Sequence, residues 1–240
     1  MESTDVQNFE HLEELRRRII KISFMFILSF VAALIFVQDI YHWLVRDLDG
    51  KLAILGPSDI LWVYMIISSV FAIAVTIPVA AYQTWLFVKP ALTKEESRIT
   101  LSFIPGLFIL FIAGISFGYF VLFPTVLGFL TNLSAGQFEL MFTADKYFRF
   151  MLHLSLPFGF LFEMPLVVMF LTRLGILNPM KLAKARKISY FVLIIISILI
   201  TPPDFISDIL VIVPLLLLYE LSVTISRFVY KKKIASDASM

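Results

Sequence analysis

Glu163 is a single acidic residue inside a long apolar stretch that runs from Phe150 to Thr172. A charged side chain near the centre of a bilayer disfavours insertion by about 2.5–3.5 kcal/mol, so such residues usually face a cavity or a partner. Pro165 cannot donate a backbone hydrogen bond to the carbonyl of Leu161, which leaves an acceptor nearby. Glu163 is therefore a candidate intramembrane polar site. The alternative is a protonated glutamic acid that only helps a helix to pack.

A second candidate site consists of two acids just before the first apolar stretch. Glu13 and Glu14 stand four residues before Arg17 and Arg18, which is the spacing of favourable ion pairs on one helix. Apolar residues recur around them at helical spacing, which predicts an amphipathic helix on the membrane surface over 1–18. The spacing alone favours the helix ion pairs over a binding role.

A third candidate site is the acid pair Glu95 and Glu96, which precedes another apolar stretch. Thr93 stands three residues before Glu96, and this is the capping-box pattern that opens a helix. The spacing alone again favours a structural role for these acids.

No catalytic or metal-binding pattern accompanies these acids. The three His residues are scattered, Cys is absent, and no HExxH or phosphate-loop motif occurs. Gly114 and Gly118 form a GxxxG pattern, whose ordinary meaning is close helix packing. The sequence therefore predicts no enzyme, no catalytic residue, no cofactor and no metal site.

The composition indicates which elements hold these residues. Sixty percent of the 240 residues are hydrophobic and 16% are charged, against about 45–50% and about 25% in soluble domains. A soluble fold cannot bury that much apolar surface. The net charge of +2 implies no attraction to nucleic acid. The predicted fold class is an all-α, polytopic integral membrane protein.

About 20 apolar residues are needed for a helix to cross the bilayer core. One membrane domain over 1–240 is predicted, with a cytoplasmic segment at 1–18 and a cytoplasmic tail at 227–240. Its six predicted spans are 19–38, 60–87, 99–128, 148–172, 188–200 and 209–226. A loop is expected after the third span, and the fifth covers only about 20 Å at about 1.5 Å per residue.

The distribution of charge predicts the orientation of these spans. Sixteen of the 20 basic residues fall on one side of the six-span arrangement, and eight acids fall on the other. The positive-inside rule places the basic side, and with it both termini, in the cytoplasm. The two halves show no inverted repeat, which disfavours a transporter built from repeats.

Five segments carry a recognisable pattern, in this order along the chain: 11–18, 87–96, 162–165, 201–204 and 214–220. Together they resemble the TatC family, the receptor core of the twin-arginine protein translocase. Within them, the residues taken as structural motif positions are Phe87, Pro90, Leu92, Pro165, Pro202, Pro203 and Asp204. Any one segment is weak, but all five in order on six spans are specific.

The resemblance implies a cupped, glove-like bundle of six helices whose last two are short. It implies recognition of paired-arginine signal peptides for the export of folded proteins, driven by the proton gradient. It also implies TatA- and TatB-type single-span partners, an oligomeric complex, and location in the lipid bilayer of the bacterial cell inner membrane. By motif, Glu14 and Glu96 match the acids that receive the arginine pair, with Glu13 and Glu95 as adjacent candidates. Glu163 matches the buried acid on the concave side.

Elementary chemistry agrees with this resemblance, because carboxylates meet guanidinium groups through bidentate, charge-assisted bonds that lysine cannot reproduce. The predicted function is therefore a signal-peptide receptor. The alternative is a proton-coupled small-solute transporter that uses Glu163 as its proton carrier, suggested by one central acid and several prolines.

Overall fold

The computed structural model describes residues 2–46, 48, 52–134, 141–201 and 205–237. These residues are almost entirely helical and form no strand, although an isolated bridge pairs Ala53 with Thr143. Contacts divide the chain into two compact units. Unit 1 is Met1–Phe108 with Thr143–Asp145, and unit 2 is Ile109–Phe142 with Lys146–Met240. The single membrane domain and the cupped shape stay predictions.

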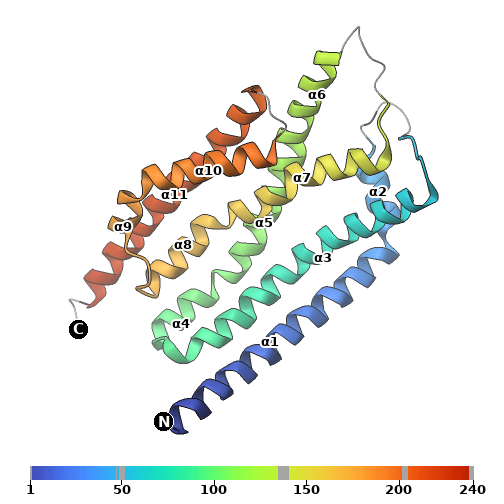
Figure 1. The fold of residues 1–240 in the computed structure, drawn as a ribbon. Coiled ribbons are helices and arrows are strands. Elements are labelled where there is room, and N and C mark those ends of the chain that lie inside the picture. Colours follow the sequence, from blue (N-terminus) through green and yellow to red (C-terminus); the bar gives the residue numbers. More distant parts are fainter. Residues whose placement is uncertain (1, 47, 49–51, 135–140, 202–204, 238–240) are drawn as a thin grey trace. The chain divides into compact units, whose positions relative to one another are not determined.

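Unit 1 is built on two long helices that run side by side, α1 (Glu2–Ile35) and α3 (Pro57–Val88) (Figure 1). Small side chains are buried on both helices, and such residues allow helix backbones to approach closely. They include Ser29 and Ala33 on α1, and Ser68 and Ala72 on α3. The remaining helical segments of this unit are α2 (Val37–Leu44), η1 (Lys89–Ala91), α4 (Lys94–Leu101) and the start of α5 (Ile104–Phe117).

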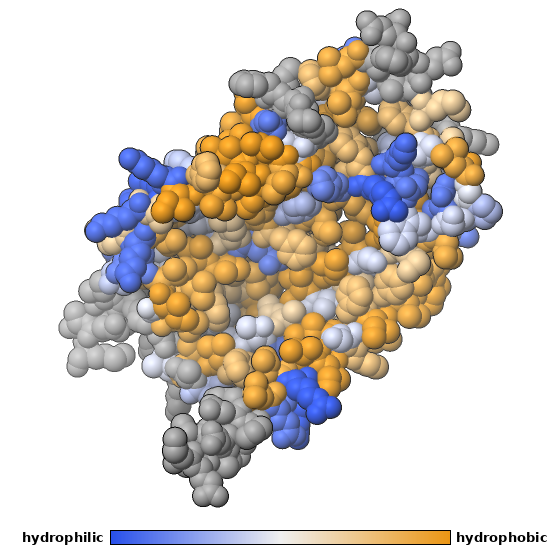
Figure 2. Space-filling view, viewed as in Figure 1, coloured by the Kyte–Doolittle hydropathy of each residue, from blue (hydrophilic) through white to orange (hydrophobic). Residues whose placement is uncertain are grey.

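The predicted surface segment and the predicted first span form one continuous helix, α1. Its span exposes large apolar side chains on the face turned away from α3, including Phe24, Ile27 and Leu28, each more than half exposed. Figure 2 shows that hydrophobic surface covers most of the visible face of the molecule. Such a surface is suited to lipid rather than to water.

Unit 2 contains the rest of α5 and the helices that follow it. They are η2 (Gly118–Leu122, a π-helical turn), α6 (Phe123–Ser134), α7 (Ala144–Phe162, from Lys146 on), α8 (Met164–Arg173), α9 (Pro179–Lys184), α10 (Arg186–Ile200) and α11 (Phe205–Asp237). Its core is apolar and joins η2, α7, α10 and α11 through the buried residues Leu122, Phe158, Leu193, Val211, Leu215, Tyr219 and Val223.

The GxxxG pattern packs against α7, as the sequence predicts. A Cβ atom on Gly114 would lie 2.3 Å from the carbonyl oxygen of Phe158, and one on Gly118 would lie 2.4 Å from the Cα of Ser155. Neither position has room for a side chain, so the two glycines allow the backbones of these helices to meet.

Five helical segments of the described chain are long and apolar enough to cross a membrane: Leu12–Ile35, Pro57–Val88, Ser97–Leu133, Ala144–Arg173 and Ser207–Lys231. They correspond to the predicted first, second, third, fourth and sixth spans. The predicted fifth span is α10, whose 15 residues cover about 22 Å at about 1.5 Å each. The all-helical membrane class is confirmed, and the count of six spans stays a prediction.

Two expectations about helix ends are wrong. The loop expected after Gly128 is helix as far as Ser134, and the Thr131 hydroxyl is satisfied locally by the Gly128 carbonyl at 2.9 Å. The last helix is not short, because α11 has 33 residues and continues beyond its apolar stretch as far as Asp237. Pro214 lies inside α11 without ending it.

Candidate functional site

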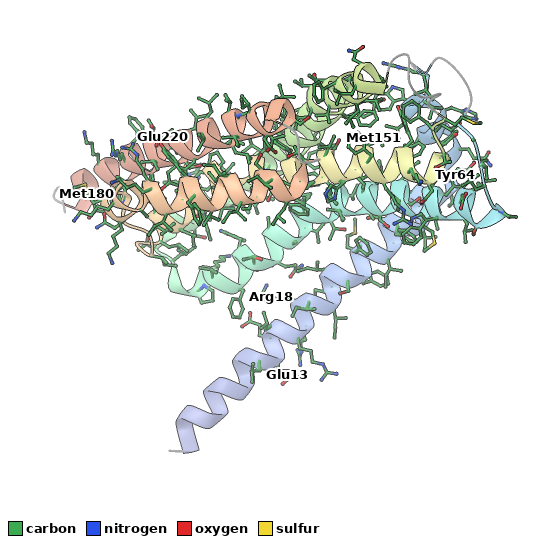
Figure 3. The ribbon with its side chains drawn as sticks, turned by 45° about the horizontal axis from the view of Figure 1, so that its top comes forward. Glu13, Arg18, Tyr64, Met151, Met180 and Glu220 are labelled. Atoms are coloured by element: carbon green, nitrogen blue, oxygen red, sulfur yellow. The ribbon has the colours of Figure 1, made fainter. Side chains whose placement is uncertain are left out.

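The predicted ion pairs on α1 are both present. Glu13 Oε1 accepts a hydrogen bond of 2.8 Å from Arg17 Nη2, and these side chains are 61% and 73% exposed. Glu14 Oε1 accepts hydrogen bonds from both Nη2 and Nε of Arg18, the second at 3.2 Å. Figure 3 shows Glu13 and Arg18 on different sides of α1. The first pair is therefore a surface pair, whereas the second faces another element.

That element is the C-terminal end of α3. Arg18 Nη1 donates to the backbone carbonyl of Gln83 at 3.1 Å, and the guanidinium carbon lies 6.0 Å from the centre of the Phe87 ring. This distance is within the range of a cation–π contact. The motif residue Phe87 therefore lies beside the arginine that holds Glu14. The sequence identified Arg18 only as a helix partner of Glu14.

The same end of α3 also contacts α4. Trp85 Nε1 donates to the backbone carbonyl of Ser97 at 3.1 Å, and Lys89 Nζ lies 5.1 Å from the centre of the Trp85 ring. Pro90 lies in the 3₁₀ turn η1, and Leu92 is the extended residue that ends this turn. The chain thus reverses from α3 into α4 within a few residues.

Glu95 and Glu96 lie in the first turn of α4. The amide of Ser97 donates to the carbonyl of Thr93 at 2.9 Å, so the helix starts where the capping pattern predicts. Both predicted acid pairs are therefore carried by helices that contact the last turns of α3, one through Arg18 and the other through Trp85.

Glu163 lies at a break between α7 and α8. Its amide donates to the carbonyl of Phe160 at 3.2 Å, and its carbonyl accepts from the amides of Leu166 and Val167 at 3.0 Å each. Pro165 cannot continue the regular helical pattern, which accounts for the break. Within the described chain, Glu163 Oε1 is buried and has no hydrogen-bond partner. The site therefore contains a carboxyl oxygen that can accept a bond from a polar group.

A further polar cluster surrounds Glu220, and the sequence indicated no partner for this acid. Arg186 Nη2 lies 2.8 Å from Glu220 Oε2, and the hydroxyl of Tyr190 donates to Oε1. Two features of the sequence could have indicated this pair: Glu220 is an acid near the end of an apolar span, and the loop before α10 is basic.

Three of the predicted motif positions cannot be placed. Pro202, Pro203 and Asp204 lie outside the described residues. The described residues contain no group of three or more His, Cys, Asp or Glu side chains that could hold a metal ion.

Comparison with known proteins gives consistent matches over most of the chain. The model of the family described as Sec-independent protein translocase protein (TatC) matches residues 10–214. The chain is 70% identical to the Sec-independent protein translocase protein TatCd of Bacillus subtilis (strain 168), over 100% of this chain and 99% of that protein. It is 41% identical to TatCy of the same organism, over 100% and 96%.

Solved structures agree with the sequence matches. A crystal structure of the twin-arginine translocase receptor TatC superimposes with a TM-score of 0.77 at 32% identity, covering 91% of this chain and 99% of that chain. A second crystal structure of that receptor, in the detergent DDM, gives 0.79 at 32% identity over 90% and 99%. The chain therefore belongs to the TatC family, whose members are components of a protein translocase and not enzymes.

Proposed function

We propose that this protein is the receptor of the twin-arginine translocase and binds the paired arginines of a signal peptide at Glu14 and Glu96. One observation carries the proposal: the last turns of α3 contact both the helix that bears Glu14 and the helix that bears Glu96. Glu14 and Glu96 belong to two helices that meet the same end of α3, and two acidic residues are the chemistry that binds two guanidinium groups through charge-assisted bonds. Glu13 and Glu95 are adjacent candidates, and Glu13 is paired with Arg17 on the exposed side of α1.

The proposed receptor spans the bacterial inner membrane six times, with both termini in the cytoplasm. The positive-inside distribution of the basic residues supports this orientation. In this arrangement α10 is the fifth span, and the bilayer beside it adapts to a helix shorter than the core. Glu14 and Glu96 then lie on the cytoplasmic side, where a signal peptide arrives.

The proposed complex also contains single-span partners of the TatA and TatB type, is oligomeric, and uses the proton gradient for export. Glu163 is the proposed contact for a polar group of a partner helix, because its buried Oε1 has no hydrogen-bond partner within the described chain. A polar group in a membrane span usually marks such a contact. A proton-coupled solute transporter is not proposed, because the chain belongs to a family of translocase components.

The experiment is the binding of a labelled twin-arginine signal peptide to the full chain purified in detergent. The control peptide has both arginines replaced by lysine. We expect the arginine peptide to bind at least about tenfold more tightly, which corresponds to about 1.4 kcal/mol. Equal binding of the two peptides would contradict the receptor function.

Variants of the same protein test the residue assignments. We expect Glu14→Gln and Glu96→Gln each to weaken arginine-peptide binding by about tenfold, because each removes one charged acceptor. Glu13→Gln and Glu95→Gln should have smaller effects. If the double variant Glu14→Gln/Glu96→Gln binds as the wild type does, the two assignments are wrong.

A further inference from the structure

We infer that Arg18 is a positioning residue for the proposed signal site: it holds one oxygen of Glu14 and anchors that carboxylate to the end of α3. The other oxygen remains for an arginine of the signal peptide. This inference rests on the proposed function. It assigns to Arg18 a role that acts through Glu14 and not through direct contact with the signal.

The chain contains an internal comparison for this inference. Arg17 and Arg18 are neighbours, and each pairs with a glutamate four residues before it. Arg17 is 73% exposed, whereas Arg18 is only 16% exposed. An exposed pair of this spacing contributes little to stability, because solvent screens the charges and ordering two long side chains costs entropy. The burial of Arg18 therefore distinguishes it from an ordinary helix pair.

Three different kinds of partner hold the Arg18 guanidinium. They are the carboxylate of Glu14 on its own helix, and the backbone carbonyl of Gln83 and the ring of Phe87 on α3. A guanidinium has five N–H donors in a rigid plane, so it can satisfy two acceptors and stack on a ring at the same time. Lysine, as a point charge on a flexible stem, cannot reproduce all three contacts.

The contacts to Glu14 leave part of its carboxylate available. Both Nε and Nη2 of Arg18 bind Oε1, and neither binds Oε2. A carboxylate can accept about four hydrogen bonds over its two oxygens. The Glu14 side chain is 39% exposed, so a second donor can approach its carboxylate.

Fixing the carboxylate has a direct consequence for binding. A side chain that is already ordered loses less conformational entropy when a ligand arrives. The anchor on α3 also places Glu14 at the helix end that contacts α4 through Trp85 and Ser97. Arg18 therefore helps to set the position of Glu14 relative to the helix that carries Glu96.

The test uses the full chain in detergent and the two signal peptides, with Arg18→Gln, Arg18→Lys and the matched control Arg17→Gln. We expect Arg18→Gln to weaken binding of the arginine peptide by about tenfold, and binding of the lysine peptide by about twofold or less. Arg18→Lys should also weaken the arginine peptide, because it keeps the charge and loses the planar fork. Arg17→Gln should change neither affinity by more than about twofold.

Replacing Arg18 in a chain that already carries Glu14→Gln distinguishes a role through Glu14 from a general structural role. If Arg18 acts through Glu14, then Arg18→Gln has no further effect on arginine-peptide binding once Glu14 is replaced. Effects that add in the double variant would overturn the inference. Tighter binding by Arg18→Gln would also overturn it, because Arg18 would then compete with the signal for Glu14.

Two controls keep the result unambiguous. If Arg18→Gln does not fold, as judged by gel filtration and thermal unfolding, Arg18→Lys carries the same comparison with the charge retained. If the wild type binds both peptides equally, the proposed receptor function fails. If the wild type prefers arginine and neither Arg18 variant weakens binding of the arginine peptide, only the role of Arg18 is wrong.

Discussion

Arg186 and Glu220 form an ion pair of 2.8 Å between Nη2 and Oε2 that joins the first residue of α10 to α11. Tyr190, one turn further along α10, donates to the other oxygen of Glu220. The Tyr219 ring lies edge-on to Tyr190, with centroids 5.6 Å apart, and its hydroxyl donates to the carbonyl of Leu182 in α9 at 2.9 Å. Figure 3 places Glu220 within this group of helices. Glu220 thus connects α11 to α10 through both of its oxygens, and Tyr219 connects α11 to α9.

Replacing Glu220 by Gln should lower the thermal stability of the purified protein. The substitution removes the charge that pairs with Arg186 and weakens the bond from Tyr190. Because the paired side chains are 38% and 36% exposed, the ion pair contributes only about 0.2–1 kcal/mol. Thermal unfolding in detergent measures the change. Tyr190→Phe should have a smaller effect, and an unchanged midpoint in Glu220→Gln would show that the cluster does not stabilise the fold.

Replacing Gly114 or Gly118 by Ala should destabilise the packing of α5 and η2 on α7. The added Cβ would lie within 2.4 Å of α7 backbone atoms, so the helices must separate. Overpacking of this kind costs about 1–3 kcal/mol. Gly128→Ala is the matched control, because a Cβ at Gly128 meets nothing within 4 Å. Equal unfolding midpoints for Gly114→Ala and Gly128→Ala would contradict the close approach.

Replacing Trp85 by Phe should loosen α4 with little change in the rest of the chain. The variant keeps a ring beside Lys89 and loses the hydrogen bond of 3.1 Å to the Ser97 carbonyl. A bond of this kind contributes about 0.5–1.5 kcal/mol. Hydrogen exchange should increase at the amides of α4. Tyr82→Phe is the control, because its ring still stacks on Trp85. If hydrogen exchange in α4 is unchanged in Trp85→Phe, the bond from Trp85 to Ser97 does not hold α4 in place.

The buried hydroxyl pair of Thr172 and Ser226 joins α8 to α11 at 2.7 Å. Thr172 donates its single proton to the Val168 carbonyl, so Ser226 must be the donor in the pair. Thr172→Val should therefore destabilise more than Ser226→Ala, because it leaves a buried donor without its acceptor. Such bonds contribute about 0.6 kcal/mol on average in membranes, with a maximum near 1.7. Unfolding by denaturing detergent measures both variants, and the reverse order would show that the assigned donor is wrong.

Patterns within short stretches of sequence predicted the spans, the ion pairs on α1 and one close helix contact. Charge-free runs predicted the positions of five helices that are long enough to span a membrane. The Glu–Arg spacing on α1 predicted both ion pairs, and the GxxxG pattern predicted a close helix contact. Each of these predictions rests on the spacing of residues along one stretch of helix, and the helical repeat decides which of them share a face.

Helix ends were predicted less well. Hydropathy marks where an apolar stretch stops, but a helix continues wherever its backbone hydrogen bonds stay satisfied. For this reason α6 passes Gly128, and α11 extends well beyond its last apolar turn.

The sequence by itself determined the membrane class, the family resemblance and the acids that are candidates for binding. Only the tertiary structure decided which residues of other helices meet the polar side chains. Arg18 meets Gln83 across 65 positions of the chain, and Arg186 meets Glu220 across 34. Whether such residues meet depends on how each helix is rotated about its axis and where it packs against its neighbour. Packing between helix faces sets both the rotation and the position of each helix, and hydropathy along a single helix does not predict either.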